Sequence, residues 1–494
     1  MGSSVLIKKI LILIVAGIFC VVVGTYIGEQ EYFWLVIAFS AVAFILFLQN
    51  PQMLGWICIV LYFSRITAPG IPGKLNLYYI MASILIGIIF LKTMLGGLKR
   101  TEWSFPHTCL AGFGIVVLLT MMIRGAGFRM LGSEQWGGMV YVQLFVGMFM
   151  VLALNHAGIN KIWMRRALVV MGILSILPLI ADILVVAGKL WIWKVIQPNE
   201  DIISSYQATQ KVMEQGVVRY HSGGVTGIFL LFALLTRVDV KRLTSIRGIW
   251  LWPLPVIFFG LVLISGHRLG VVIFGLFVMV LAYIQRAFTF TRIWLLCMTA
   301  IIGWFVLVEW SPYFPEGVQR SISWIPGVDI PDYVRKDAEN TMEWRLLLWS
   351  EAMKKFPEYW LIGKGYAFSG KEMIGVAGAN VTTAPLDWAL ISNSYHNGPI
   401  SLLLGLGIFG LLTGAGFLLG ALVRHRRFLK RKWVDPNLKC SHQAVYALFL
   451  TYVLVFFTLF GAVEEFSPFL FMFALLETLQ RLDRNQIEAA RTSS

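Results

Sequence analysis

Long apolar runs recur from one end of this 494-residue sequence to the other, and they constrain the fold more than any other feature. A helix that crosses a bilayer needs about 20 predominantly apolar residues. Counting shorter and tilted runs, about fourteen segments are long enough to cross. They begin near Ile10, Phe33, Met53, Leu77, Pro106, Met139, Ala167, Gly223, Ile249, Leu269, Ile293, Pro399, Gln443 and Glu465. Because 58% of the residues are hydrophobic and 14% are charged, a soluble multidomain protein is excluded. We therefore predict an all-α polytopic membrane protein in which residues 1–494 form a single membrane domain.

The net charge of +15 comes mainly from lysines and arginines beside the ends of apolar runs. The positive-inside rule produces this pattern, so the charge indicates membrane topology, and we expect no nucleic-acid partner. If Lys8 and Lys9 are cytoplasmic, alternating spans place the later basic clusters, including residues 424–432, on the same side. Both termini are then cytoplasmic. The final run, with Glu464 and Glu465 at its start, leaves a second possibility, a re-entrant segment that would put the tail outside.

Two outer segments are too long to be turns, residues 189–222 and residues 311–398. Loops of this length in compact proteins are usually functional or disordered, and the density of tryptophan in the second favours order. Within it, Asn340 followed by Glu343 is typical of a helix N-terminus, and apolar residues then recur at helical spacing. These are Met342, Leu346, Trp349, Met353 and Phe356. We predict an amphipathic helix over residues 341–356, which lies either on the bilayer surface or against its own loop.

The most informative polar stretch is Asn393-Ser-Tyr-His-Asn-Gly-Pro399, which leads into a membrane-length apolar run. His396 therefore sits where a predicted span meets water. Imidazole changes charge near neutral pH. This histidine is thus either an acid, a base or a hydrogen-bond donor at a functional site, or only an interfacial cap.

Two arginines fall on the same outer side as His396, against the usual bias of basic residues for the inside. Arg219 lies beside His221, and Arg268 directly follows His267 at a nearly loop-free junction between two spans. A guanidinium in such a position is costly unless it reaches the headgroups or meets an anion. Its fork matches phosphate oxygens, so phosphate binding is the functional hypothesis, and snorkelling to headgroups is the alternative.

Other kinds of site have weaker patterns. A metal site formed by His221, His267 and His396 would put a cation beside arginines, with no carboxylate within a few residues, so we expect no metal and no cofactor. Gly363-Lys-Gly365 is glycine-rich but lacks the Walker spacing for nucleotide phosphates. Asp182 falls within an apolar run, where it either pairs with an outer arginine or lines a channel.

Four motifs, spread over residues 219–410, together resemble bacterial O-antigen ligases and the wider superfamily of ligases and polymerases. His396-Asn397, nine residues and then Gly407-Ile-Phe-Gly410 match the histidine motif of the ligases at its fixed positions. Ser265-Gly-His-Arg268 is similar to the S-x-S-R element of the superfamily, with His267 in place of the usual serine. Arg219 with Gly223 or Gly224 is similar to its arginine-to-glycine start of an earlier span. The outer-loop pattern is represented by Arg345, Trp349, Ala352, Pro357, Gly363 and Gly365, with Lys364 inside the glycine pair.

The resemblance implies an inverting, metal-independent glycosyltransferase on a GT-C-like membrane scaffold. Such an enzyme transfers a glycan from an undecaprenyl-diphosphate carrier to a hydroxyl of a glycan or lipid A-core acceptor, at the periplasmic face of the bacterial inner membrane. The residues at matching or neighbouring positions divide into two sets. The expected catalytic residues are His396, Arg268 and Arg219, and the expected substrate-binding residues are Arg345, Asn397, His221 and His267.

Three alternatives stay open. An O-antigen or exopolysaccharide polymerase and a protein O-oligosaccharyltransferase share this scaffold and differ in the acceptor. A lipid-linked glycan flippase or other transporter would also be polytopic and basic. Transporters, however, place polar residues at mid-membrane, whereas the charges here stand at span ends, apart from Asp182. The complete fit of the histidine spacing favours the ligase.

Overall fold

The computed structural model describes residues 50–67, 76–96, 102–128, 135–197, 219–377, 384–463 and 466–492. The predicted segments that begin near Ile10 and Phe33 lie outside these residues, as does most of the predicted outer segment 189–222. Each of the other predicted segments coincides with a helix. The longer helices are α3 (Pro51–Leu61), α4 (Leu77–Met94), α5 (Phe105–Arg124), α6 (Met139–His156), α7 (Lys161–Leu174), α8 (Ile176–Val186), α10 (Ser222–Leu235), α12 (Pro253–Ile264), α13 (Arg268–Ile284), α14 (Phe290–Glu309), α16 (Asp332–Lys354), α20 (Gly398–Leu429), α21 (Pro436–Thr458) and α22 (Phe466–Thr492).

Short elements connect them. They are α11 (Val240–Leu243), α15 (Glu316–Ile322), α17 (Phe356–Tyr359), α18 (Gly370–Ala377), α19 (Ala384–Ser392), the 3-10 helices η2 (Leu190–Lys194), η3 (Ile246–Leu251) and η4 (Ser311–Tyr313), and the strands β1 (Gln135–Trp136) and β2 (Phe368–Ser369). The two strands pair antiparallel, with Gln135 opposite Ser369, and this tie joins the loop after α5 to the segment between α14 and α20.

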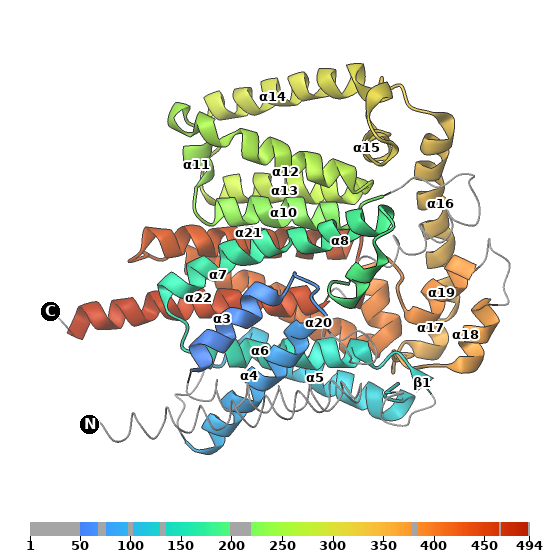
Figure 1. Ribbon diagram of the computed structural model, residues 1–494. Coiled ribbons are helices and arrows are strands. Elements are labelled where there is room, and N and C mark those ends of the chain that lie inside the picture. The colour runs from blue at the N-terminus through green and yellow to red at the C-terminus, as the bar shows by residue number, and fades with distance from the viewer. Residues whose placement is uncertain are drawn as a thin grey trace.

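Eight helices in the described part of the chain are long and apolar enough to cross a membrane, and three shorter apolar helices accompany them. The protein is therefore a multi-pass, all-α membrane protein, as the apolar runs predict. Helix α14 has no buried residue and lies along one edge of the bundle (Figure 1). Most of its apolar side chains are exposed, which suits contact with lipid tails, and Leu307 and Val308 near its end pack partly against the segment that follows.

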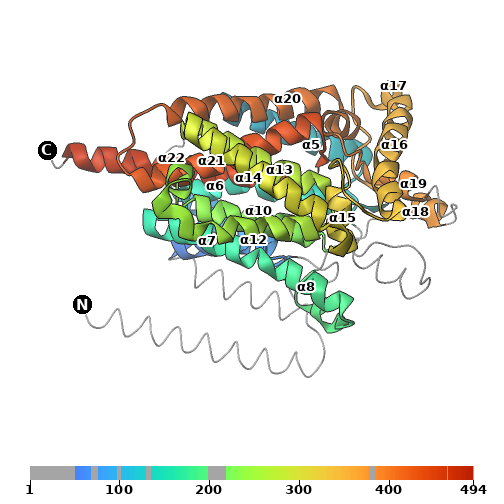
Figure 2. The ribbon, with the colours of Figure 1, turned by 90° about the horizontal axis from the view of Figure 1, so that it is seen from above.

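The helices run side by side (Figure 1), and the two ends of the bundle carry different residues. We call the end that carries α15 to α19 the loop end, and the opposite end, where Arg424, Arg427, Arg431 and Arg484 lie, the basic end. Seen from above, α16 to α19 extend beyond one end and the C-terminus beyond the other (Figure 2). The outer residues of the predicted topology thus gather at one end, and residues 424–432 at the other.

Helix α22 is the segment for which the sequence left two possibilities. It is one continuous helix of 27 residues that packs along α6 and α21. Near its middle Glu477 pairs with Arg424, and further on Arg484 pairs with Glu102, so α22 reaches the basic end. The helix is too polar for the hydropathy of a membrane span. Its polar side chains Glu477, Thr478 and Gln480 are buried within the protein, so they do not face lipid.

Helix α16 covers most of the segment 341–356 that was predicted as a helix, but it starts earlier. Helix α16 begins at Asp332, directly after Pro331, because proline favours a helix start and an acidic first turn complements the helix dipole. It ends at Lys354, and the separate α17 follows. In its second half, its buried side is formed by Leu348 and Ala352, which pack against the other outer helices and the start of α20. Leu346 and Met353, which belong to the predicted apolar repeat, are exposed.

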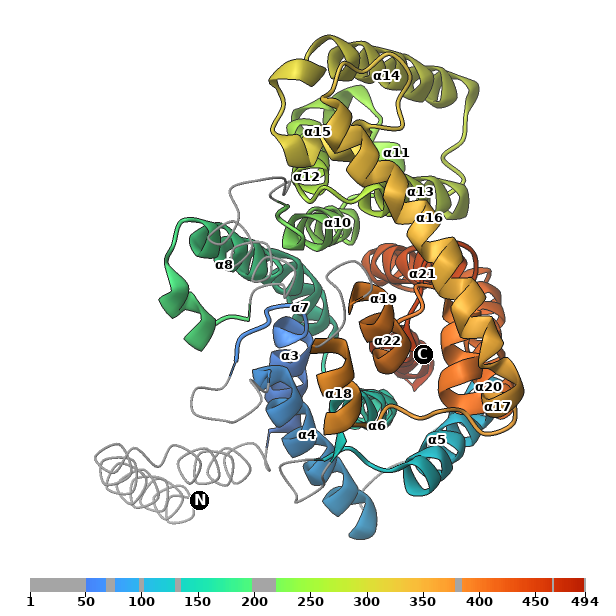
Figure 3. The same ribbon diagram turned by 90° about the vertical axis from the view of Figure 1, so that its right-hand side faces the viewer.

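Helix α16 crosses the loop end from α15 to α17, as Figure 3 shows. Its first turns contact α15, and its last turns contact α17, α19 and α20. Because α15 packs on α12 and α13, helix α16 connects this group of membrane helices to the group that contains α20. It does so on the face where the predicted site residues lie.

Candidate functional site

His396 lies immediately before α20, and the cap of that helix fixes its position. The Asn397 Oδ1 accepts a hydrogen bond from the backbone N–H of Ile400 at 3.1 Å, and Pro399 occupies the first turn. Asn397, expected to bind substrate, therefore caps the helix through its oxygen. His396 itself has φ of 51°, a left-handed conformation that histidine and asparagine tolerate better than most residues.

Three hydrogen bonds hold the turn that precedes His396. The Asn393 amide donates to the Gly365 carbonyl oxygen, and Tyr395 donates its hydroxyl hydrogen to the Asn393 Oδ1 at 2.8 Å. The indole N–H of Trp349, on α16, donates to the Tyr395 carbonyl oxygen at 2.8 Å. The outer-loop motif residues Trp349 and Gly365 thus orient the histidine motif, although they are far from it in sequence.

The two glycine motifs meet at a break in α20. Gly407 has φ of 75°, which interrupts the helix. Residues 360–366, which we call the glycine strap, lie against this break. The Lys364 and Gly365 N–H groups donate to the carbonyl oxygens of Leu404 and Gly405, at 2.8 and 3.0 Å. In return, Ile408 donates to the Trp360 carbonyl oxygen at 2.7 Å.

This contact requires glycine on both sides. A Cβ on Gly363 would lie 2.2 Å from the backbone of Gly405, and one on Gly407 would lie 2.2 Å from the Leu361 carbonyl oxygen. Arg124, at the end of α5, also donates to the Gly363 carbonyl oxygen at 3.0 Å. The strap therefore docks the outer segment onto the first half of α20, the half that directly follows His396.

Lys364 has a structural role that the sequence pattern around it did not predict. Its ammonium donates to the carbonyl oxygens of Leu390 and Ile391, at 3.2 and 3.1 Å, at the C-terminal end of α19. Burial lowers the pKa of this lysine to about 8. The resemblance of Gly363-Lys-Gly365 to a phosphate loop is therefore misleading, because the ammonium is occupied by the helix end and the backbone N–H groups by α20.

The remaining predicted residues lie at the starts of α10 and α13. Gly266, with φ of 70°, makes the tight junction between α12 and α13, and the Arg219 side chain packs over it. The rings of His221 and His267 are in contact through their nitrogens, with centroids 4.2 Å apart. Asp182 is buried and accepts a hydrogen bond from the Ser222 N–H at 2.9 Å. It thus caps α10 and fixes the helix that presents His221.

Arg320, on α15, belongs to this group and was missed from the sequence. Its side chain is only 6% exposed, and its guanidinium donates to the Gly266 carbonyl oxygen at 2.6 Å. No motif surrounds it. The one available signal was its place in an outer loop, where an arginine goes against the positive-inside bias.

Arg345 connects the arginine group to His396. Burial lowers its pKa, and the positive charges of Arg268 and Arg320 lower it further. Its guanidinium carbon lies 5.4 Å from the centre of the Phe460 ring, and the His396 ring lies 4.7 Å from the same ring. Trp344, the neighbour of Arg345 on α16, has its ring 5.4 Å from His396. The Arg345 Nε forms no hydrogen bond with the described residues.

The electrostatic character of the site is strongly positive. Burial lowers the pKa of His221 to about 4, assisted by the charges of Arg219, Arg320 and Arg65. The imidazole is therefore neutral at neutral pH, and it lies inside a cluster of guanidinium groups. Within the described ranges, no three histidine, cysteine, aspartate or glutamate side chains lie together as metal ligands.

The predicted set is thus gathered around one place. Arg219, His221, His267 and Arg268 surround the α12–α13 junction, and Arg345 reaches them from α16. His396 adjoins them across Phe460. Such an arrangement offers several guanidinium groups to an anion and one imidazole beside it, flanked by aromatic rings.

Comparison with protein families agrees with this geometry. Residues 254–415, from α12 to the first half of α20, match the family model described as O-antigen ligase. Over this segment the chain is similar to O-antigen ligases. The resemblance drawn from the motifs is confirmed, and O-antigen ligase domains act in glycan transfer in membranes. The matched segment contains Arg268, Arg320, Arg345 and His396, whereas Arg219 lies before it. A search of curated proteins found no significant match.

Proposed function

We propose that this protein transfers a glycan from an undecaprenyl-diphosphate carrier to an acceptor hydroxyl, with the loop end at the periplasmic face. One observation carries the proposal. Arg219, Arg268, Arg320 and Arg345 come from four separate segments to one place beside His396. A cluster of like charges is costly, and a diphosphate is the substrate group that would offset the cost.

The arginines act on the leaving group. Transfer breaks the bond between the anomeric carbon and the diphosphate, and negative charge grows on the oxygen that departs. Guanidinium groups held in place before the reaction stabilise that charge without reorganising. Arg320 is held by the Gly266 carbonyl oxygen, and Arg345 is held over Phe460.

His396 acts on the nucleophile. It accepts the proton of the acceptor hydroxyl as that oxygen attacks the anomeric carbon, and attack from the face opposite the diphosphate inverts the configuration. The fixed turn before α20 sets the direction of the imidazole, and Trp344 and Phe460 beside it provide surfaces on which sugar rings stack. The arginines supply the positive charge in this mechanism, so it uses no metal ion.

Among the enzymes that share this chemistry, we favour the ligase, because the spacing from His396 to Gly410 fits its motif. The decisive experiment is analysis of surface glycans in a deletion strain. Unligated, carrier-linked polymer is the expected result. Single repeat units on the acceptor would identify a polymerase instead, and loss of glycoprotein alone would identify a protein glycosylating enzyme.

The assigned roles predict different defects in purified, reconstituted protein. His396→Asn keeps a residue that tolerates the left-handed backbone, removes the base, and should lower the transfer rate ~10²- to 10⁴-fold with donor affinity unchanged. Arg268→Ala should weaken donor binding as well as turnover, with only partial rescue by lysine. Loss of donor binding in His396→Asn, together with full binding in Arg268→Ala, would reverse the roles. Carrier-linked glycan crossing sealed vesicles with His396→Asn would favour a transporter.

A further inference from the structure

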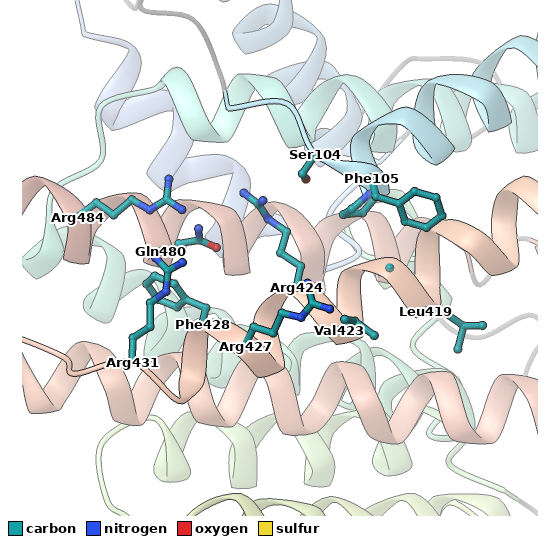
Figure 4. Close-up of a pocket in the computed structure, with 12 residues that line it drawn as sticks. Ser104, Phe105, Leu419, Val423, Arg424, Arg427, Phe428, Arg431, Gln480 and Arg484 are labelled. Carbon is teal, nitrogen blue, oxygen red and sulfur yellow. The ribbon is translucent and has the colours of Figure 1, made fainter.

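A second basic site lies at the opposite end of α20 from His396. The start of α5, the last turns of α20 and the middle of α22 enclose a pocket of about 540 Å³ (Figure 4). Arg424, Arg427 and Arg431 line it from α20 and the residues that follow, and Gln480 and Arg484 line it from α22. None of these residues takes part in the proposed transfer.

Two of the four arginines are neutralised within the protein. Arg424 makes two hydrogen bonds, of 2.6 and 3.0 Å, to the buried carboxylate of Glu477, and Arg484 pairs with Glu102. Arg427 makes no ion pair with the described residues, and Arg431 lies over the ring of Phe428 at 5.8 Å. The pocket therefore keeps an excess of two positive charges, both on exposed side chains.

A buried amide in the same wall indicates that the pocket receives a polar ligand. Gln480 is 3% exposed, and its Oε1 has no hydrogen-bond partner among the described residues. A buried polar atom left without a partner destabilises the fold. A ligand hydroxyl would satisfy it, and would do so with either orientation of the amide, because a hydroxyl both donates and accepts. The N-terminus of α5, at Phe105, adds the positive end of a helix dipole.

Apolar side chains lie next to these polar groups. Phe105, Leu419 and Val423 line the pocket and are all substantially exposed. A free phosphate ion would leave these side chains uncovered, whereas an acyl chain would cover them. Basic pockets between membrane helices, with apolar residues below the charges, suit a lipid headgroup at the bilayer surface.

We propose that this pocket binds an anionic glycerophospholipid, with its phosphodiester at Arg427 and Arg431 and a headgroup hydroxyl at Gln480. Phosphatidylglycerol has this chemistry. The lipid would come from the leaflet at the basic end. The proposal is independent of the glycan donor and acceptor, because its residues belong to the other end of the bundle.

The test compares the lipid retained by two charge-matched double variants. Arg427→Gln with Arg431→Gln removes the two pocket charges, and Arg426→Gln with Lys430→Gln removes two neighbouring exposed charges that do not line the pocket. Each full-length protein is purified in detergent, delipidated, titrated with phosphatidylglycerol and analysed by native mass spectrometry. Near a charged surface each arginine contributes roughly fivefold to affinity, so the pocket variant should bind roughly thirtyfold more weakly. The control should bind within about twofold of the unmodified protein.

Two further experiments identify the ligand. Gln480→Met removes the buried amide without changing charge, and it should lower the preference for phosphatidylglycerol over phosphatidic acid, which lacks the headgroup hydroxyl. Inorganic phosphate should not raise the melting temperature at concentrations where phosphatidylglycerol does. The proposal is overturned if phosphate stabilises the protein as well as the lipid does, or if both double variants lose lipid equally.

Discussion

Replacing Gly363 by alanine tests whether the glycine strap positions His396. The added Cβ would lie 2.2 Å from the backbone of Gly405 and 2.3 Å from the Leu406 nitrogen, so the strap cannot keep its place. Its displacement removes the three backbone hydrogen bonds between residues 360–366 and the break in α20. At about 1 kcal/mol net for each bond, docking loses about 3 kcal/mol. This loss lowers the ratio of docked strap to released strap roughly 150-fold.

The expected consequence is local. Released from the strap, the first half of α20 loses the support that Gly365 gives to Asn393 in the turn before His396. The transfer rate should then fall by up to roughly 150-fold. Hydrogen exchange measured by mass spectrometry should show faster exchange at the amides of Lys364 and Ile408, while the amides of α22 keep their protection. Because exchange is measured at individual segments, the experiment distinguishes release of the strap from unfolding of the whole protein.

Gly370→Ala is the matched control, because a Cβ there meets no atom within 4 Å and the residue lies in the same outer segment. It should leave both transfer and exchange unchanged. The reasoning fails if Gly363→Ala transfers glycan within about twofold of the unmodified protein while its strap amides exchange faster. In that case α20 would hold His396 without help from the outer segment.

Three further outcomes are expected. Arg345→Lys keeps the charge but loses the planar fork over Phe460, so donor affinity measured by calorimetry should fall several-fold, whereas Lys336→Ala, an exposed position on the same helix, should have no effect. His221 has a pKa of about 4 in the fold and an ordinary value of 6.5 when unfolded, so the unfolded chain binds the extra proton first and stability is lost as pH falls from 6.5 to 4. The loss amounts to ~3 kcal/mol, and His221→Asn should flatten the dependence of melting temperature on pH across that window. Chelator should leave the transfer rate unchanged, and activity that is lost to chelator and restored by a divalent cation would contradict the metal-free mechanism.

The sequence predicted the helices and the shared side of the site because both follow from short-range patterns. Apolar length predicts spans, and basic residues at their ends predict which end of the bundle each loop occupies. The membrane-length apolar run after Pro399 placed His396 at a helix start, where the structure has it. The same rules cannot predict which outer residues touch, since that depends on how α16 crosses the loop end.

Arg320 and Lys364 show the physical limit of prediction from sequence. The role of Arg320 depends on one carbonyl oxygen, that of Gly266, contributed by a junction 54 residues earlier in the chain. Lys364 stands between two motif glycines and resembles a phosphate ligand, yet its ammonium is used by the end of α19. In both cases the partner is a backbone carbonyl, which every residue carries and no sequence pattern marks.

The proposed mechanism also explains why the arginines come from separate segments. Four guanidinium groups repel one another, and flexible side chains on one helix would turn apart. Here Arg320 is held by Gly266 and Arg345 by Phe460, so the repulsion is already present before substrate arrives. The diphosphate gains negative charge as the glycosidic bond breaks, so the cluster binds the departing diphosphate more tightly than the glycosylated one. That difference in binding, rather than tight binding of the donor itself, is what lowers the barrier to transfer.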